Sequence, residues 1–370
     1  MAFVNDNYCN LKDSYLFSQI AQKVNAYVAE HPEKKVIRMG IGDVTLPLAP
    51  AVIDAMQKAV AEMGVKETFR GYGPEQGYDF LHEAIVKYYA GFGVTLASDE
   101  IFISDGAKSD CGNITDIFSN ANTILIPDPV YPVYLDTNIM CGRKIVYMDG
   151  KPENNFLPMP DDSVKADIIY LCSPNNPTGN VFPAIEIERL ITAFDGIVVV
   201  DEAYIDFSSR PSWIRRLNEF HNLVVLQTFS KAWGSAGVRL GMAFASTEII
   251  GILSKIKYPY NVNQLTQKQA IEMLHKYYEI ERWVKRLKEA RENLENRFSE
   301  LPLTVKVFPS DANFFLARVT DAVKIYNYLV GEGIIVRNRN SISLCGNCLR
   351  VTVGTRMEND KLIEALKSYE

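Results

Sequence analysis

Short runs of apolar residues alternate with stretches of helical spacing over the first two thirds of the chain. The runs are rich in β-branched residues and continuous, which is typical of strands buried on both faces of a sheet. Their alternation with helices predicts an α/β domain with a mostly parallel sheet, from about residue 40 to 262. The predicted strands are 101–104, 123–126, 168–171, 197–200, 223–227 and 241–245.

The pattern changes after residue 263. Residues 264–300 place Ile280, Leu287 and Leu294 at helical spacing, which predicts a long helix with one core-facing stripe. Shorter strand-like runs follow at 314–317, 334–336 and 349–353. We therefore expect a smaller α+β domain over 263–370. Residues 1–39 are assigned to an N-terminal arm and a segment of the small domain.

Length and charge restrict the class of protein. A chain of 370 residues exceeds what one core usually holds, which agrees with two domains. The net charge of -6 argues against a basic nucleic-acid-binding surface. The chain has neither an apolar run of bilayer length nor a basic-then-apolar leader. We expect a cytoplasmic protein that binds neither nucleic acid nor a membrane.

The cysteines and histidines do not form a recognisable metal site. Cys345 and Cys348 have the spacing of half a zinc site, but no second pair and no nearby histidine completes it. The six cysteines are mostly scattered singly, so we expect reduced, buried thiols. We predict that no metal is bound.

The segment 227–241 combines a lysine with groups that suit a phosphate. A predicted strand ends in Thr228 and Ser230, Lys231 follows, and a turn rich in small residues leads to Arg239. A lysine reacts with an aldehyde only if it is held in place and loses its proton. Arginine and hydroxyl groups are good phosphate partners. Alone, a lysine at a strand end would usually belong to a solvated turn.

Four other predicted strands also end in chemically suitable residues. Asp201 could hold a pyridinium nitrogen protonated, and Tyr204 and Asn176 could bond the phenolic oxygen of the same ring. Tyr131 offers an aromatic plane for stacking, and the backbone of 106–108 an anion nest. Open α/β sheets bind ligands at the carboxyl ends of their strands, so we expect one shared site.

This ordered set resembles the fold-type I, class I/II aminotransferases over nearly the whole chain. The resemblance implies pyridoxal 5'-phosphate, with Lys231 as Schiff-base lysine and proton shuttle and Asp201 at the ring nitrogen. It also implies a homodimer with a shared active site. Arg350 matches the small-domain arginine that grips a substrate acid group, beside Gly42 and Asn176. The residues implied for the phosphate are Gly106, Ala107, Lys108, Thr228, Ser230 and Arg239, with Tyr72 from the partner subunit.

The two halves of the chain resemble different members of that family. Up to about residue 180, stretches 13–17, 37–45, 68–77 and 105–110 are similar to LL-diaminopimelate aminotransferase. That likeness implies Tyr15, Glu75 and Lys108 at the distal end of the substrate. The remainder, over 201–207, 228–241, 257–260 and 333–355, is similar to histidinol-phosphate aminotransferase. That likeness implies a pocket lined by Tyr258, and Arg337 with Arg350 at a phosphate or carboxylate.

We interpret the chain as an aminotransferase that exchanges an amino group between a small amine and 2-oxoglutarate or glutamate. LL-2,6-diaminopimelate, of lysine biosynthesis, is slightly preferred, and histidinol phosphate, of histidine biosynthesis, is almost level. Elimination or decarboxylation on the same fold is a third possibility. A non-catalytic relative is a fourth, against which the retention of Lys231, Asp201, Asn176, Tyr204 and Arg239 argues.

Overall fold

The computed structural model describes residues 2–11, 24–33, 35–42, 47–158 and 165–369. Its large domain is built on a seven-stranded sheet in the order β2-β8-β7-β6-β5-β3-β4. Only β8 runs antiparallel to its neighbours, so the predicted mostly parallel α/β sheet is confirmed. The strands are β2 Ile101–Ser104, β3 Thr123–Asp128, β4 Lys144–Asp149, β5 Ile168–Cys172, β6 Ile197–Asp201, β7 Leu223–Thr228 and β8 Gly241–Phe244.

Six of these strands coincide with the predicted runs, because each is buried on both faces and carries an almost unbroken apolar sequence. The sequence pattern missed β4. It lies at the sheet edge, its side chains are mostly exposed or half-buried, and Lys144 and Asp149 bound it. Residue-by-residue pairing with β3 holds it in place, which local sequence does not reveal.

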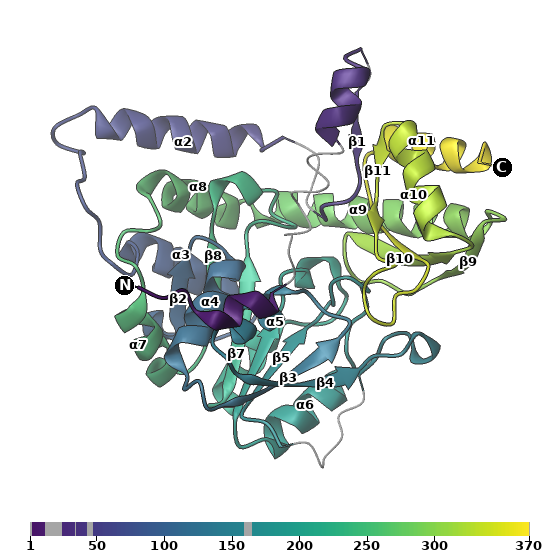
Figure 1. The fold of residues 1–370 in the computed structure, drawn as a ribbon. Coiled ribbons are helices and arrows are strands. Elements are labelled where there is room, and N and C mark those ends of the chain that lie inside the picture. Colours follow the sequence, from purple (N-terminus) through teal and green to yellow (C-terminus); the bar gives the residue numbers. More distant parts are fainter. Residues whose placement is uncertain (1, 12–23, 34, 43–46, 159–164, 370) are drawn as a thin grey trace.

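Helices cover the sheet and connect it to the second domain (Figure 1). The predicted single helix over 264–300 is broken at Lys276 into α8 and α9. The two helices pack in different places: α8 packs on α2 and α3, whereas α9 reaches the core of the small domain. The α-helices are α2 Pro50–Met63, α3 Asp79–Ala90, α4 Ala107–Ile117, α5 Val133–Met140, α6 Ala184–Ala193, α7 Thr247–Ile256, α8 Gln264–His275, α9 Tyr277–Ser299, α10 Ala322–Gly331 and α11 Arg356–Lys367.

Short 3-10 helices occupy several of the connections: Asp6–Asn10, Ser98–Glu100, Pro152–Asn154, Ile205–Phe207, Trp213–Glu219 and Ala236–Val238. The last of these follows Lys231 and precedes Arg239. Within the described ranges, no helix combines the length and the apolar character that crossing a membrane requires.

The small domain contains a four-stranded antiparallel sheet in the order β12-β13-β10-β9. Its strands are β9 Thr304–Val307, β10 Phe314–Val319, β12 Arg337–Asn338 and β13 Cys348–Thr352. The N-terminal segment joins this domain, because β1 Ile37–Arg38 pairs in parallel with β11 Ile334–Ile335. Four of the six cysteines are buried and all six are free thiols, but Cys9 is exposed, contrary to the expectation of buried thiols throughout.

The boundary between the hydrophobic cores of the two domains lies within α9. Val284 and Leu287 pack into the core of the large domain, whereas Leu294 and Phe298 pack into that of the small domain. The predicted domain boundary at 262–263 stays a prediction, and by packing alone the division falls later, within α9. One helix therefore runs through both cores and ties the small-domain sheet to the large domain (Figure 1).

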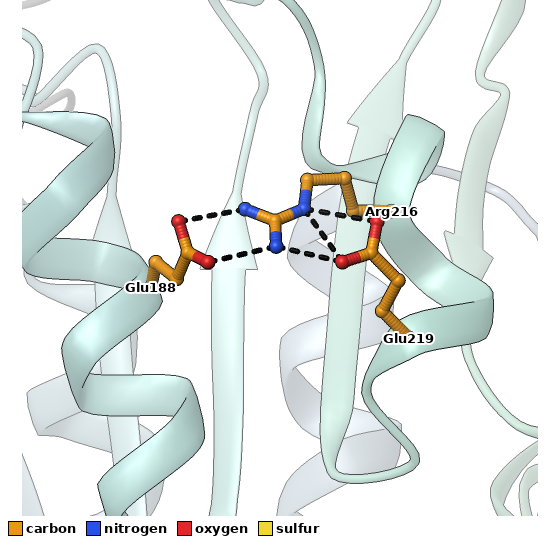
Figure 2. A network of polar contacts seen from close by, with 3 residues as sticks. All are labelled: Glu188, Arg216 and Glu219. Carbon is orange, nitrogen blue, oxygen red and sulfur yellow. Dashed lines mark hydrogen bonds and ion pairs between the residues drawn. The ribbon is translucent and has the colours of Figure 1, made fainter.

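Figure 2 shows an arginine that links two elements on the outside of the large domain. Arg216 pairs with Glu188 of α6 at 2.8 Å and with Glu219 at 2.7 Å. Hydrogen bonds from the guanidinium hold the pKa of both carboxyls below their usual range. Because all three groups reach solvent, we expect the network to fix the position of the 213–219 helix more than to add stability.

A buried arginine supports the helix that begins at the predicted phosphate site. Arg143 is 5% exposed and donates to the carbonyl oxygens of Thr115 at 2.7 Å and Ser119 at 3.1 Å. It also donates to Oδ1 of Asn138 at 2.9 Å. Helix ends leave carbonyl groups without intrahelical partners, and a cation there also suits the helix dipole. Arg143 therefore caps the C-terminal end of α4.

Replacing Arg143 by leucine should lower the free energy of unfolding by about 3 kcal/mol, because buried carbonyl groups lose their donors. Denaturant unfolding measures this loss. Arg356→Leu is the matched control, since its side chain is 97% exposed, and its effect should stay within about 0.5 kcal/mol. Similar effects of the two substitutions would contradict the capping role.

Candidate active site

Lys231 lies just after β7, where residues of both domains meet. Its side chain is half-buried, and Nζ donates to the carbonyl oxygen of Gly42 at 3.4 Å. The amine lies 5.2 Å from the centre of the Tyr204 ring. Asn313, just before β10, donates to the same Gly42 oxygen at 3.1 Å. The predicted reactive lysine is thus held at the junction of the large and small domains.

Arg350 approaches this junction from β13. It is 2% exposed, and its two terminal nitrogens donate to Oδ1 of Asn176 and to the carbonyl oxygen of Gly40, both at 2.7 Å. A Cβ on Gly42 would lie 3.4 Å from Nη2 of Arg350 and 3.5 Å from the Tyr204 hydroxyl. The Lys231 amine and the Arg350 guanidinium therefore both lie close to one residue, Gly42.

Asp201 ends β6 as a buried carboxylate. Tyr134 donates its hydroxyl to Oδ2, and the backbone N–H of Ala203 donates to Oδ1 at 2.9 Å. Burial raises the pKa of Asp201, and Tyr134, Ala203 and the Lys231 ammonium oppose that rise. A protonated ring nitrogen placed against this carboxylate would favour its ionised form in the same way.

Tyr134 is a site residue that the sequence reasoning missed. It lies in α5, three residues after Tyr131, and the two rings meet edge to face at 6.2 Å. Tyr131 itself is half-buried. The signal in the sequence was the second tyrosine one helical turn beyond the first, but its direction toward Asp201 depends on how α5 packs.

A cluster suited to an anion forms at the start of α4. Gly106 precedes the helix with φ +141°, and a Cβ there would lie 2.4 Å from Nη2 of Arg239. Arg239 also lies 3.5 Å from the Ser230 hydroxyl, and Thr228 accepts the Ser230 N–H at 3.1 Å. A helix N-terminus with an arginine and hydroxyls is a ready anion site, and half-buried Ala107 opens that helix.

Several of the predicted site residues are exposed to solvent in the single chain. Tyr72 is 87% exposed and stacks on Tyr260 at 4.6 Å, while Tyr258 is 80% exposed. Glu75 and Lys108 are also exposed. Tyr15 lies outside the described residues. The distal-end assignments therefore remain predictions, and Tyr72 in particular was expected to serve a partner subunit.

Arg337 is brought beside Arg350, as the sequence predicted. The two residues are register partners on β12 and β13, and Arg337 is 3% exposed. Arg339, two residues on, is also buried, although the sequence reasoning gave it no role. Its position two residues after Arg337 on a strand was the signal that could have found it, because alternate strand residues share a face.

Lys231, after a strand of the open α/β sheet, faces Arg350 of the small-domain sheet, and this arrangement suits the transfer of an amino group. The family model for aminotransferases of class I and II matches residues 34–366, and the chain belongs to this family. Enzymes of the family depend on pyridoxal phosphate.

Named relatives reflect both resemblances. Histidinol-phosphate aminotransferase of Bacteroides fragilis is 58% identical over 282 residues, 74% of this chain and 81% of that protein. LL-diaminopimelate aminotransferase of Parabacteroides distasonis is 46% identical over 268 residues, 67% of this chain and 65% of that protein. Among solved structures, L,L-diaminopimelate aminotransferase of Chlamydomonas reinhardtii matches with a TM-score of 0.86 and 28% identity, covering 99% of this chain and 98% of that one.

The two sequence matches overlap. Their shares of 74% and 67% together exceed the chain by 41%, so they have at least that fraction in common. Each match is therefore longer than the half of the chain that first pointed to it. The change of likeness near residue 180 stays a prediction.

Gly106→Ala should weaken binding of pyridoxal phosphate about tenfold or more, because a Cβ there displaces Arg239 and costs a charge-assisted hydrogen bond. Titration of the cofactor-free protein with pyridoxal phosphate measures this affinity. Gly112→Ala is the matched control on the same helix, since a Cβ at Gly112 meets nothing within 4 Å. Equal affinities in the two variants would contradict a phosphate at Gly106.

Proposed function

We propose that this chain is a pyridoxal-phosphate-dependent aminotransferase whose amino donor is histidinol phosphate and whose acceptor is 2-oxoglutarate. The donor amine becomes a carbonyl group, and 2-oxoglutarate becomes glutamate. The convergence of the Lys231 amine and the Arg350 guanidinium on Gly42 carries the proposal. An acid group held by Arg350 would leave the reacting carbon of a small substrate near the amine.

The residues fit pyridoxal phosphate from end to end. Its phosphate would be held by Arg239, Ser230, Thr228 and the α4 N-terminus, where a Cβ at Gly106 would leave no room. Buried Asp201 would hold the ring nitrogen protonated, and Asn176 and Tyr204 would hydrogen-bond the phenolic oxygen. Tyr131 is available for the ring face. When bound, the cofactor supplies an electron sink that stabilises negative charge on the substrate carbon.

The protein's own groups then handle protons and charge. The Lys231 amine can take the proton from the substrate carbon that bears nitrogen, and return it elsewhere. Asp201 would keep the ring nitrogen of the bound cofactor protonated, and the Tyr134 hydroxyl holds the Asp201 carboxylate in place. Arg350 serves both half-reactions, because its guanidinium group can donate two hydrogen bonds to the acid group of either substrate.

Two observations favour histidinol phosphate as the amine. A second buried arginine, Arg337, lies directly across from Arg350, and two guanidinium groups suit a doubly charged phosphate ester better than one carboxylate. The Bacteroides fragilis relative named for this substrate is also the more similar of the two relatives compared. The slight preference for LL-diaminopimelate drawn from sequence is therefore reversed in this proposal.

LL-diaminopimelate is the second candidate. Glu75 and Lys108 are the charges that its distal ammonium and carboxylate would need, and the algal neighbour named for it aligns with nearly all of the chain. Both side chains are exposed in one chain, so they would be completed by a partner subunit or by closure around substrate. A homodimer and a cytoplasmic location remain predictions, the first supported by exposed Tyr72.

Lys231→Ala should abolish the visible absorbance of the lysine-bound cofactor and slow the single-turnover reaction with glutamate by about a thousandfold or more. Absorbance spectroscopy with excess pyridoxal phosphate follows both. Lys255→Ala, at an exposed lysine, is the control for adventitious labelling and should leave both unchanged. A wild-type protein without the band or the reaction would refute the enzyme proposal.

Two substitutions distinguish the substrate candidates. Arg337→Gln should lower kcat/KM for histidinol phosphate by about tenfold or more, while Glu75→Ala should leave it within about threefold. If LL-diaminopimelate is used, Glu75→Ala should reduce its turnover far more than that of glutamate. Steady-state rates with the three compounds provide the comparison. Equal losses of LL-diaminopimelate and glutamate turnover in Glu75→Ala would eliminate the second candidate, and faster wild-type turnover of LL-diaminopimelate would overturn the order proposed.

A further inference from the structure

Among the residues that the structure describes, Arg339 is a buried cation that forms no ion pair. It is 5% exposed, and its Nε atom has no hydrogen-bond partner in the described part of the chain. Burial and the neighbouring charges of Arg350 and Arg337 lower its pKa well below the ordinary value. Burying an unpaired charge is costly, so such a side chain indicates a partner that the protein chain does not itself supply.

The register of the small-domain sheet places Arg339 on the substrate side. Arg337 pairs with Arg350, and the ladder continues beyond β12 because the Arg339 N–H donates to the Cys348 carbonyl at 2.9 Å. Residues two apart on a strand point to the same face. Arg337, Arg339 and Arg350 therefore share one face, the face from which Arg350 reaches Asn176. Arg318, the register partner of Cys348, lies on the same face, but it is only half-buried and its guanidinium lies over the Phe308 ring.

Three buried guanidinium groups on one face exceed what a single carboxylate can neutralise. A phosphate monoester carries nearly two negative charges at neutral pH and has three acceptor oxygens. Arginine forks bind phosphate with particular strength, because their donors match its geometry. The charge and donor count of this face therefore match a phosphate ester.

We propose that Arg339 is a specificity-determining residue that completes a three-arginine receptor with Arg337 and Arg350, and so selects phosphorylated amines over dicarboxylic substrates. The inference rests on the proposed function and deepens it by naming the substrate class. The receptor acts on binding and leaves the proton transfers at Lys231 untouched. Removing Arg339 should therefore raise KM for a phosphate-bearing substrate and leave kcat nearly unchanged.

The test compares Arg339→Gln with wild-type holoenzyme on histidinol phosphate and on glutamate. We expect KM for histidinol phosphate to rise at least tenfold and the glutamate half-reaction to change less than threefold. Arg339→Lys, which keeps the charge but loses the fork, should be intermediate. Arg356→Gln is the control, since Arg356 lies on α11 and its side chain is 97% exposed. It should change neither substrate more than threefold.

A binding measurement separates this inference from the proposed reaction. Inorganic phosphate should raise the thermal unfolding temperature of cofactor-loaded wild-type protein, whose cofactor phosphate site is already filled, and should do so far less in Arg339→Gln. If histidinol phosphate is not turned over, but phosphate raises the unfolding temperature of wild type and not of Arg339→Gln, the receptor stands and the proposed substrate fails.

Two results would overturn the receptor: an equal loss of activity toward both substrates in Arg339→Gln, or an equal thermal shift with phosphate in wild type and Arg339→Gln. Should Arg339→Gln not fold, an Arg339→Lys variant with wild-type KM would overturn it equally.

Discussion

The contact of Arg350 with Asn176 and Gly40 is the constraint on which the site depends. It joins a small-domain strand to a loop at the end of β5 and to the segment that leads from β1 into the large domain. The guanidinium is almost fully buried, so its donors must be satisfied by these acceptors or by a ligand. This contact, or its ligand-bound counterpart, therefore sets where the Arg350 guanidinium lies relative to Gly42 and Lys231.

The parallel sheet explains why the remaining groups converge on that contact. In β3, β5, β6 and β7 the apolar strands are buried on both faces, and the polar residues that follow them emerge at one edge. This arrangement has an electrostatic consequence at Asp201, because burial at the strand end raises the pKa of its carboxyl group and favours the protonated form. Tyr134 and the Lys231 ammonium offset that preference, and a cationic ring nitrogen would complete the compensation.

The parts of this architecture that could be predicted from sequence are those determined by local pattern. Continuous apolar runs identified β2, β3 and β5 to β8, and polar residues after them located Lys231, Asp201 and Asn176. Edge strand β4 was missed because pairing, and not its own sequence, makes it a strand. The break at Lys276 and the direction of Tyr134 depend on packing between helices. Glu75 and Tyr72 are exposed in the single chain, so the substrate and cofactor contacts predicted for them depend on more than one chain's packing.

The mixed likeness of the chain follows from this division of labour. Cofactor chemistry is built on strand ends of the large domain, which both kinds of relative require in the same form. In the proposed function, substrate choice would be made elsewhere, by the exposed segment around Glu75 and by the arginine face of the small-domain sheet. Arg350 contacts the cofactor residue Asn176. The hydrogen bonds that Lys231 and Asp201 make among the described residues go to neither surface, so either surface can change while Lys231 and Asp201 keep their roles. The buried arginines differ from the exposed acid in one respect: their desolvation is already incurred in the folded chain, and an anion bound beside Arg339 would offset part of it. That asymmetry is the physical reason to rank a phosphate-bearing amine first.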